Sequence, residues 1–334
     1  MLKVGHLITS VDIPILNIYN LCKHKISKEL QHYVITDNRY DFIDFFKHDD
    51  IPCFVVNNEK AYQNLFKKTD IIHLHWIGYN RKEHDLVKGS QVPFLVTLYK
   101  PEKLPASIPF VICPFNFIKE IQGRPRNSMV IHDGINIKRF SKISNDVSLK
   151  ANNTEKTKKS ILIAPDVITQ CNDYFWILMQ EFLLKNSNSE LRIICPGWRS
   201  LNLIKAINNK KQVYTSIALS DVAIYTPFTS DVLKIQNSFH FVMIAMAMGM
   251  PCIVSKNEIF DEVIKHRKNG IVFSGDKPIH FIEGVKELLQ NRSLRKRCIV
   301  NAYQTVHDKF DVKLNVSKYE AVLLAFVKKQ KLRI

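Results

Sequence analysis

The sequence predicts an α/β protein made of two doubly wound domains that face a cleft, and three observations support this. Short, almost continuous apolar runs alternate with segments in which apolar residues recur every three to four positions, the pattern of buried parallel strands and amphipathic helices. The chain has 334 residues, about twice the length of a typical domain. A polar stretch rich in Lys, Asn, Ser and Thr, Ser141–Ser160, divides the pattern into two halves.

The first half alternates strands with helices. Helices are predicted at Ile15–Leu30 and Glu59–Thr69, where apolar residues recur at helical spacing. The predicted strands are 3–9, 32–36, 53–56, 70–77, 94–99, 110–114 and 128–134.

The second half repeats the alternation and ends in helices. Its most informative stretch is Val222–Pro251, which combines a strand, a turn, a polar loop, a small-residue helix and a Gly249-x-Pro251 stop before another strand. Further helices are predicted at Tyr174–Lys185 and from Pro278 onward. The predicted strands are 160–165, 191–197, 213–216, 222–227, 252–255 and 270–273.

These elements divide the chain into four parts. We predict a Rossmann-like domain at 1–145, a linker at 146–159, a second Rossmann-like domain at 160–310, and a C-terminal helix at 311–334 that packs back on the first domain.

Composition limits the class of protein and its setting. Apolar residues make up 46% and charged residues 24% of the chain, which are ordinary globular values. The seven cysteines never form a CxxC pair, and the N-terminal residues do not resemble a secretory signal, so we expect reduced thiols in the cytoplasm. No apolar run approaches the length of a membrane span.

The formal charge of +17 makes polyanions eligible partners, and the excess is larger in residues 151–334. Basic clusters lie at Lys265–Lys268, Arg292–Arg297 and Val327–Arg333. They are consistent with a solvated helical face or with attraction to an anionic membrane surface. Specific nucleic-acid binding is not expected, because neither a helix-turn-helix spacing nor an aromatic RNA-binding motif is present.

Four segments carry a family resemblance. DIIHLHWIG (Asp70–Gly78), VPFLVTLYK (Val92–Lys100), VIHDGINIKRFS (Val130–Ser141) and KNGIVFSGD (Lys268–Asp276) resemble segments of family 4 glycosyltransferases, which have the GT-B fold. The resemblance implies a retaining hexosyltransferase that uses a nucleotide-sugar donor and needs neither metal nor cofactor. It further implies a lipid-linked glycan acceptor, a role in surface polysaccharide or O-antigen synthesis at the inner membrane face, and another glycosyltransferase as a possible partner.

The resemblance also assigns candidate site residues. The donor side is expected in the second domain and the acceptor side in the first, with Ser238, Phe239 and His240 in a loop whose backbone amides hold the distal phosphate. The acceptor-side candidates are His73, His75, Tyr99 and Lys100. The donor-side candidates are Arg199, Gln236, Ser238, Phe239, His240, Ile244, Lys256 and Glu262.

The two histidines of the acceptor side have separate expected roles. We expect one imidazole of His73 and His75 to face the cleft and the other to face the packed interior. A zinc site made by this pair is not expected. For Tyr99 and Lys100, packing in the core or at the rim is the alternative to an acceptor role.

The donor motif departs from the family pattern. Gln236 and Ile244 stand where the family has two glutamates, and Ala164–Asp173 contains no basic residue where an Arg and a Lys are usual; Asp166 lies near the position of that Arg. An alternative function is therefore a noncatalytic, glycosyltransferase-like protein that binds a glycan or an active transferase.

Overall fold

A computed structural model describes residues 1–10, 15–37, 42–123, 126–141, 159–163, 173–194, 204–207, 210–225, 232–273 and 278–331. The chain forms two compact units. Unit 1 comprises Met1–Gly134 and Phe310–Ile334, and unit 2 comprises Ile135–Lys309.

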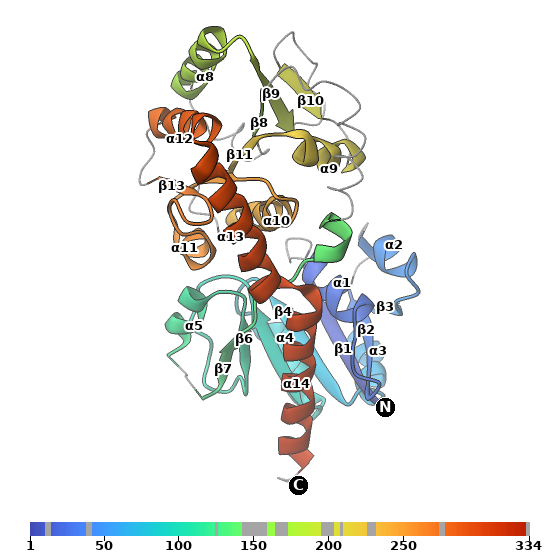
Figure 1. The fold of residues 1–334 in the computed structure, drawn as a ribbon. Helices are drawn as coiled ribbons and strands as arrows, with labels where there is room; N and C mark the ends of the chain where they lie inside the picture. Colours follow the sequence, from blue (N-terminus) through green and yellow to red (C-terminus); the bar gives the residue numbers. More distant parts are fainter. Residues whose placement is uncertain are drawn as a thin grey trace. The chain divides into compact units, whose positions relative to one another are not determined.

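Unit 1 is built on a seven-stranded parallel sheet (Figure 1). The strand order is β3-β2-β1-β4-β5-β6-β7, so the direction of winding reverses between β1 and β4. Strands β4 and β5 are buried along their whole length and β2 at all but one residue, as a sheet covered on both faces requires. The strands are β1 Leu2–Ile8, β2 Leu30–Thr36, β3 Cys53–Val55, β4 Ile71–Trp76, β5 Phe94–Leu98, β6 Val111–Cys113 and β7 Ser128–Val130.

The helices of unit 1 begin and end at local sequence signals. Asn58 and Asn80 cap α3 and α4, where each side-chain oxygen accepts a hydrogen bond from a first-turn amide. Gly123 ends α5 in the left-handed region, with φ of 58°. The helices are α1 Ile15–Lys23, α2 Phe42–Lys47, α3 Glu59–Phe66, α4 Arg81–Gly89, α5 Asn116–Gln122 and α14 Val312–Lys331.

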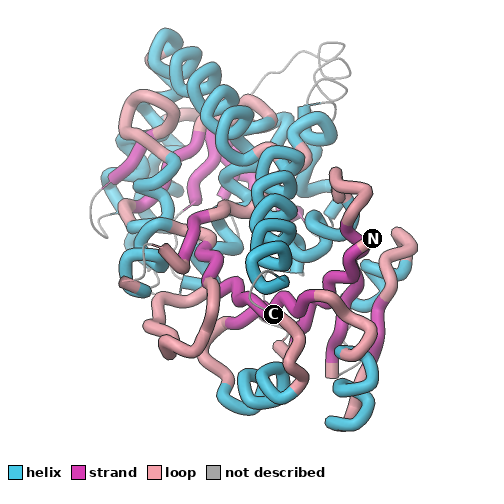
Figure 2. The backbone as a smooth tube through the Cα atoms, turned by 90° about the horizontal axis from the view of Figure 1, so that it is seen from below, coloured by secondary structure: helices cyan, strands magenta, loops and turns pink. Residues whose placement is uncertain are grey.

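The last helix, α14, completes the core of unit 1. It runs beside the strands of this unit, as Figure 2 shows. Gly134 allows its approach, because a Cβ atom there would lie 2.7 Å from the Cα of Val312. Glu320 accepts hydrogen bonds of 2.8 Å from the amides of Ile26 and Ser27, which tie α14 to the segment after α1. The core cluster contains Val4, Leu21, Leu30, Ile71, Leu95, Ile112, Ile131, Val312, Val316, Tyr319, Leu323, Phe326 and Val327.

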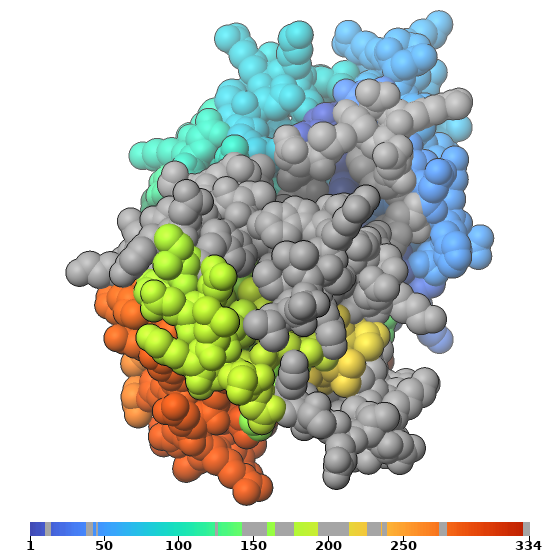
Figure 3. Space-filling view, turned by 90° about the horizontal axis from the view of Figure 1, so that it is seen from above, coloured from blue at the N-terminus to red at the C-terminus, as the bar shows by residue number. Residues whose placement is uncertain are grey.

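Unit 2 has a six-stranded parallel sheet in the order β10-β9-β8-β11-β12-β13, with the same kind of reversal between β8 and β11. Helices α8 and α12 lie side by side on its surface (Figures 1 and 3). The strands are β8 Lys159–Ile163, β9 Ser189–Ile194, β10 Ile204–Ile207, β11 Val222–Tyr225, β12 Cys252–Ser255 and β13 Ile271–Phe273. The helices are α8 Asp173–Lys185, α9 Lys210–Leu219, α10 Val232–Ala247, α11 Glu258–Val263, α12 Pro278–Gln290 and α13 Arg292–Phe310.

The predicted fold class is confirmed, since both units are doubly wound, Rossmann-like α/β halves. The Gly-x-Pro stop is confirmed as well: Gly249 has φ of 76° and follows α10, and β12 begins at Cys252. The strand predicted at 213–216 is wrong, because these residues lie within α9, which turns the side chain of Ile217 into the core. Most of the predicted linker lies outside the described residues.

Candidate functional site

A cavity of about 490 Å³ lies in unit 1 at the carboxyl ends of β1 and β4. Ligands of open α/β sheets bind at such an edge, where the strand order reverses. Thr9 and Ser10 line it after β1, and the segment from His75 to Glu83 lines it after β4. Its position makes it the leading candidate for a binding site in the described part of unit 1.

Glu83 is a buried carboxylate in this cavity wall, which Arg81 and Lys82 also line. It lies in the first turn of α4, and only 7% of its surface is exposed. Its carboxylate accepts hydrogen bonds from the indole N–H of Trp76 at 2.5 Å, the amide of Asn80 at 2.5 Å and the hydroxyl of Thr9. Burial raises the pKa of Glu83, and the nearby Asp37 adds to this, while the hydrogen bonds oppose it. The carboxylate thereby joins three segments of the cavity wall.

Beneath the cavity, buried histidines form a polar layer on one face of the sheet. His6 lies on β1, His32 on β2, and His73 and His75 on β4; none is more than 4% exposed. Burial lowers the pKa of all four imidazoles, to about 4 for His32, so they are neutral at pH 7. His75 also lines the cavity and connects the layer to it.

Hydrogen bonds connect the layer to β5, α1 and α14. His75 Nδ1 lies 3.1 Å from the hydroxyl of Tyr99, and the amide of Asn17 lies 3.4 Å and 3.1 Å from the hydroxyls of Tyr99 and Tyr319. The layer is therefore an extended network of buried polar groups.

The expectation that His73 and His75 face opposite sides is wrong. Residues two apart in a strand point to the same face, and the two ring centroids are 4.1 Å apart. Both are buried, so neither stands apart from the packed interior. Tyr99 is fully buried beneath the layer and Lys100 is partly exposed. Of the four acceptor-side candidates, His75 lines the cavity.

The expected phosphate-binding loop is wrong as well. Ser238, Phe239 and His240 lie inside α10, together with Gln236 and Ile244. Amides this far from a helix start are bonded to the carbonyls of the preceding turn, so they are not available to a phosphate. Phe239 is 1% and Ile244 is 5% exposed, and the Phe239 ring packs near Phe260, with centroids 6.4 Å apart. These two residues are part of the core of unit 2.

The other donor-side candidates are a residue at a strand end, a residue in a helix and a residue outside the described part of the chain. Lys256 is exposed and directly follows β12, and its amide donates to the carbonyl of Phe273 at 2.8 Å. Glu262 is partly exposed in α11, whose N-terminus is capped by Asn257. Arg199 lies outside the described residues, as do the segments that directly follow β8, β9, β11 and β13.

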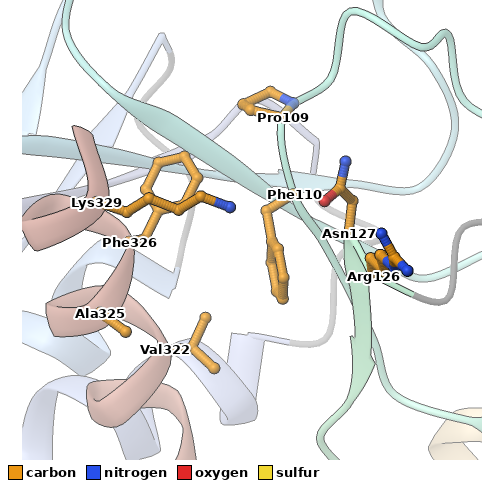
Figure 4. Close-up of a pocket in the computed structure, with 8 residues that line it drawn as sticks. All are labelled: Pro109, Phe110, Arg126, Asn127, Val322, Ala325, Phe326 and Lys329. Carbon is orange, nitrogen blue, oxygen red and sulfur yellow. The ribbon is translucent and has the colours of Figure 1, made fainter. Parts of the chain in front are cut away.

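A second hollow in unit 1 lies at the amino ends of β6 and β7. Its volume is about 300 Å³. Figure 4 shows Val322, Phe326 and Lys329 of α14 on one side, and Phe110 and Arg126 on the other. The aromatic rings of Phe110 and Phe326 lie in this hollow with their centroids 6.4 Å apart. The exposed cations Arg126 and Lys329 line it as well. This combination suits an amphiphilic anion.

Sequence reasoning missed Glu83 and His6. Asn80-x-x-Glu83 has the spacing of a helix N-cap followed by an acidic third residue, which marks a helix start in the sequence. His6 could have been noticed because it is a histidine inside the predicted buried strand 3–9.

A family model matches part of unit 2. Residues 200–305 match the family model described as "Glycosyl transferases group 1". None of the curated proteins matches the sequence.

Solved structures resemble the whole chain. A glycosyltransferase from Rickettsia africae ESF-5 is 14% identical, with a TM-score of 0.77 over 98% of this chain and 99% of that one. Anabaena Alr3699/HepE in complex with UDP-glucose is 13% identical, with a TM-score of 0.72 over 97% and 100%. UDP-GlcNAc 2-epimerase from Neisseria meningitidis, bound to UDP-GlcNAc, is 11% identical, with a TM-score of 0.63 over 97% and 100%. At these identities the likeness establishes the fold, which is that of the GT-B glycosyltransferases.

Proposed function

We propose that this protein is a glycosyltransferase that moves a sugar from a nucleotide-sugar donor to an acceptor hydroxyl. The observation that carries the proposal is the match of residues 200–305, within unit 2, to the group 1 glycosyl transferases. The fold of the whole chain supports it, because solved proteins of this fold hold UDP or UDP-glucose.

In this proposal the donor binds to unit 2. A departing diphosphate gains negative charge, so its binding site needs fixed cations or N–H dipoles. Lys256 is exposed and directly follows the carboxyl end of β12, so it is a candidate cation for the diphosphate. Arg199 is a second candidate. Because the amides of Ser238–His240 are used within α10, these side-chain cations carry more of the task than the resemblance implied.

The acceptor binds in the Glu83 cavity of unit 1. A carboxylate offers about four lone-pair positions, and Trp76, Thr9 and Asn80 occupy three on Glu83. The remaining position accepts a hydrogen bond from the acceptor hydroxyl and holds it for attack. This positioning lowers the entropic part of the barrier. Retention of configuration and the hexosyl class come from the family resemblance alone.

The acceptor class and the setting form a finer part of the proposal. We infer a lipid-linked glycan, as in surface polysaccharide or O-antigen assembly, and a chain that binds to an anionic membrane face. The charge of +17 and the hollow with Arg126 and Lys329 support this. No described helix has the length and apolar character needed to cross a bilayer. Sedimentation with anionic vesicles, but not with neutral ones, is the expected result; equal binding to both would oppose it.

A noncatalytic glycosyltransferase-like protein is the second candidate. It is favoured by Ile244, a buried apolar side chain where the family resemblance calls for a carboxylate. Such a protein would bind a glycan or an active transferase without turning over a donor.

One experiment separates the two. The purified full chain is incubated with UDP-, GDP- and other nucleotide sugars, and release of the nucleoside diphosphate is measured with and without membrane extracts as the acceptor source. We expect release with one donor class, stimulated by extract. If the protein binds no donor at millimolar concentration and releases no nucleoside diphosphate from any donor, the noncatalytic function is the one that remains.

A further inference from the structure

Three imidazoles converge inside unit 1. His6 on β1 and His73 on β4 are register partners on neighbouring strands, and His75 lies two residues further along β4 on the same face. One ring nitrogen from each of the three lies within 4.8 Å of those of the other two. All three side chains are at most 1% exposed.

The outer nitrogen of each ring already has a partner. His6 Nε2 lies 2.8 Å from His32 Nδ1, His73 Nε2 lies 2.7 Å from Thr97 Oγ1, and His75 Nδ1 lies 3.1 Å from the hydroxyl of Tyr99. This leaves His6 Nδ1, His73 Nδ1 and His75 Nε2 as the inner nitrogens. The inner nitrogens of His6 and His75 are 3.1 Å apart, and that of His73 has no hydrogen-bond partner among the described residues.

These contacts favour a particular set of tautomers. A neutral imidazole carries one N–H and one lone pair. If each outer nitrogen donates its N–H outward, three lone pairs face one another, and a cation between them would remove their repulsion. In a tetrahedral zinc site with Zn–N of about 2.0–2.1 Å, two nitrogens lie roughly 3.3 Å apart, close to the His6–His75 separation. The separations to His73 must shorten on binding.

The surroundings supply the outer contacts that a metal site requires. Ligating histidines usually donate their second N–H to a polar partner, which fixes the ring and raises its basicity. In this set of tautomers His32 Nδ1 accepts the N–H of His6, and His32 Nε2 lies 4.0 Å from Glu320 Oε1. Glu320 is 3% exposed, so solvent screens the attraction between its carboxylate and a nearby cation only weakly.

We propose that His6, His73 and His75 bind one divalent transition-metal ion of the kind that prefers imidazole, such as Zn²⁺ or Co²⁺. The ion would clamp β1 to β4 directly beneath the Glu83 cavity, which His75 also lines and from which the ion can enter. The proposal is independent of sugar transfer. The sequence offered only His73 and His75 as possible zinc ligands, and the pairing of β1 with β4 adds His6 as a third.

The competing arrangement needs no metal. If His6 Nδ1 instead donates its proton to His75 Nε2, the histidines form a neutral hydrogen-bonded chain. His73 Nδ1 then remains without a partner among the described residues, at a free-energy cost that a bound ion removes.

The test uses the full chain, stripped with chelator and titrated with Co²⁺. We expect one equivalent to bind, with the intense visible bands of tetrahedral Co²⁺, and Zn²⁺ to displace it. The variants His6→Asn and His73→Asn should each weaken Co²⁺ binding more than about 100-fold, since ligands matter at least as much as their outer partners. His84→Asn, a buried histidine of unit 1 outside the cluster, should bind like the wild type.

A second measurement covers variants that do not fold. Zn²⁺ at micromolar concentration should raise the melting temperature of the stripped wild type, and chelator should reverse the rise. Absence of both the Co²⁺ bands and the melting shift in the wild type would overturn the proposal. Equal Co²⁺ binding by folded His6→Asn and His73→Asn would overturn it too.

Discussion

The two units have sheets of the same winding but differ in what lies on the strands next to the reversal point. In unit 1, β1 and β4 carry His6, His73 and His75. In unit 2, the corresponding β8 and β11 carry no histidine, and after Lys159 and Ser160 at the start of β8 their side chains are apolar or aromatic and buried, among them Ile163 and Tyr225. The fold can therefore be built with an apolar layer. Since burying polar groups costs free energy unless every partner is met, the polar layer of unit 1 is best explained by a function.

The largest expected effect probes the apolar side of this comparison. Phe260 is fully buried in unit 2 near Phe239. Phe260→Ala should lower the free energy of unfolding by about 3–5 kcal/mol, because it removes a large buried ring and leaves a cavity. Urea denaturation measures this. A loss below about 1 kcal/mol would show that unit 2 is not held by close apolar packing.

The next prediction compares two buried carboxyl groups. In unit 2, Glu190 is paired with Arg192, whose Nη2 lies 2.7 Å away. In unit 1, burial raises the pKa of Asp133 from 3.8 to about 7. Between about pH 4 and pH 7 the folded protein holds a proton on Asp133 that the unfolded chain has released. The contribution of Asp133 to the free energy of unfolding therefore falls as the pH rises from about 4 to about 7, and it stays at this lower value above pH 7.

Asp133→Asn removes that titration. The stability of the variant relative to the wild type should rise by on the order of 2 kcal/mol between pH 5 and pH 8. Urea denaturation at the two pH values measures the difference. A difference that stays constant with pH would refute the raised pKa.

Glu83→Gln tests the wall of the cavity. The three partners of Glu83 all donate hydrogen bonds to its two carboxylate oxygens, and the NH2 group that replaces one of these oxygens in glutamine cannot accept a hydrogen bond. At least one donor is left without a partner, so the variant should lose about 1–3 kcal/mol of stability. The melting temperature reports this loss, and Glu258→Gln, an exposed carboxyl of unit 2, serves as the control. Identical melting of both variants would mean that Glu83 does not join the segments.

The smallest effect should be equal in the two units. Asn58 caps α3 in unit 1 and Asn257 caps α11 in unit 2, each by one hydrogen bond of 2.9 Å. Replacing either by alanine should cost about 1 kcal/mol, measured by urea denaturation. A clear difference between the two variants would indicate that one cap does more than end its helix.

Much of the fold could be predicted from local signals. Apolar runs and a glycine such as Gly249 mark strands and helix ends in the sequence itself. The start of α10 was also visible, because Val232, Ile235 and Phe239 recur at helical spacing, but the family resemblance placed a loop there. The convergence of His6 with His73 could not be predicted, since it depends on which strands are neighbours and in what register. Such pairing is a property of the whole sheet.

The division of labour between the two units is the central claim, and one measurement tests it directly. Donor affinity by calorimetry and transfer rate are compared for wild-type protein and Glu83→Gln, with the nucleotide sugar that supports turnover. We predict unchanged donor affinity with a transfer rate at least about tenfold lower, since the proposed function places Glu83 at the acceptor and the donor in unit 2. Loss of donor affinity in Glu83→Gln, or an unchanged transfer rate, would contradict the account.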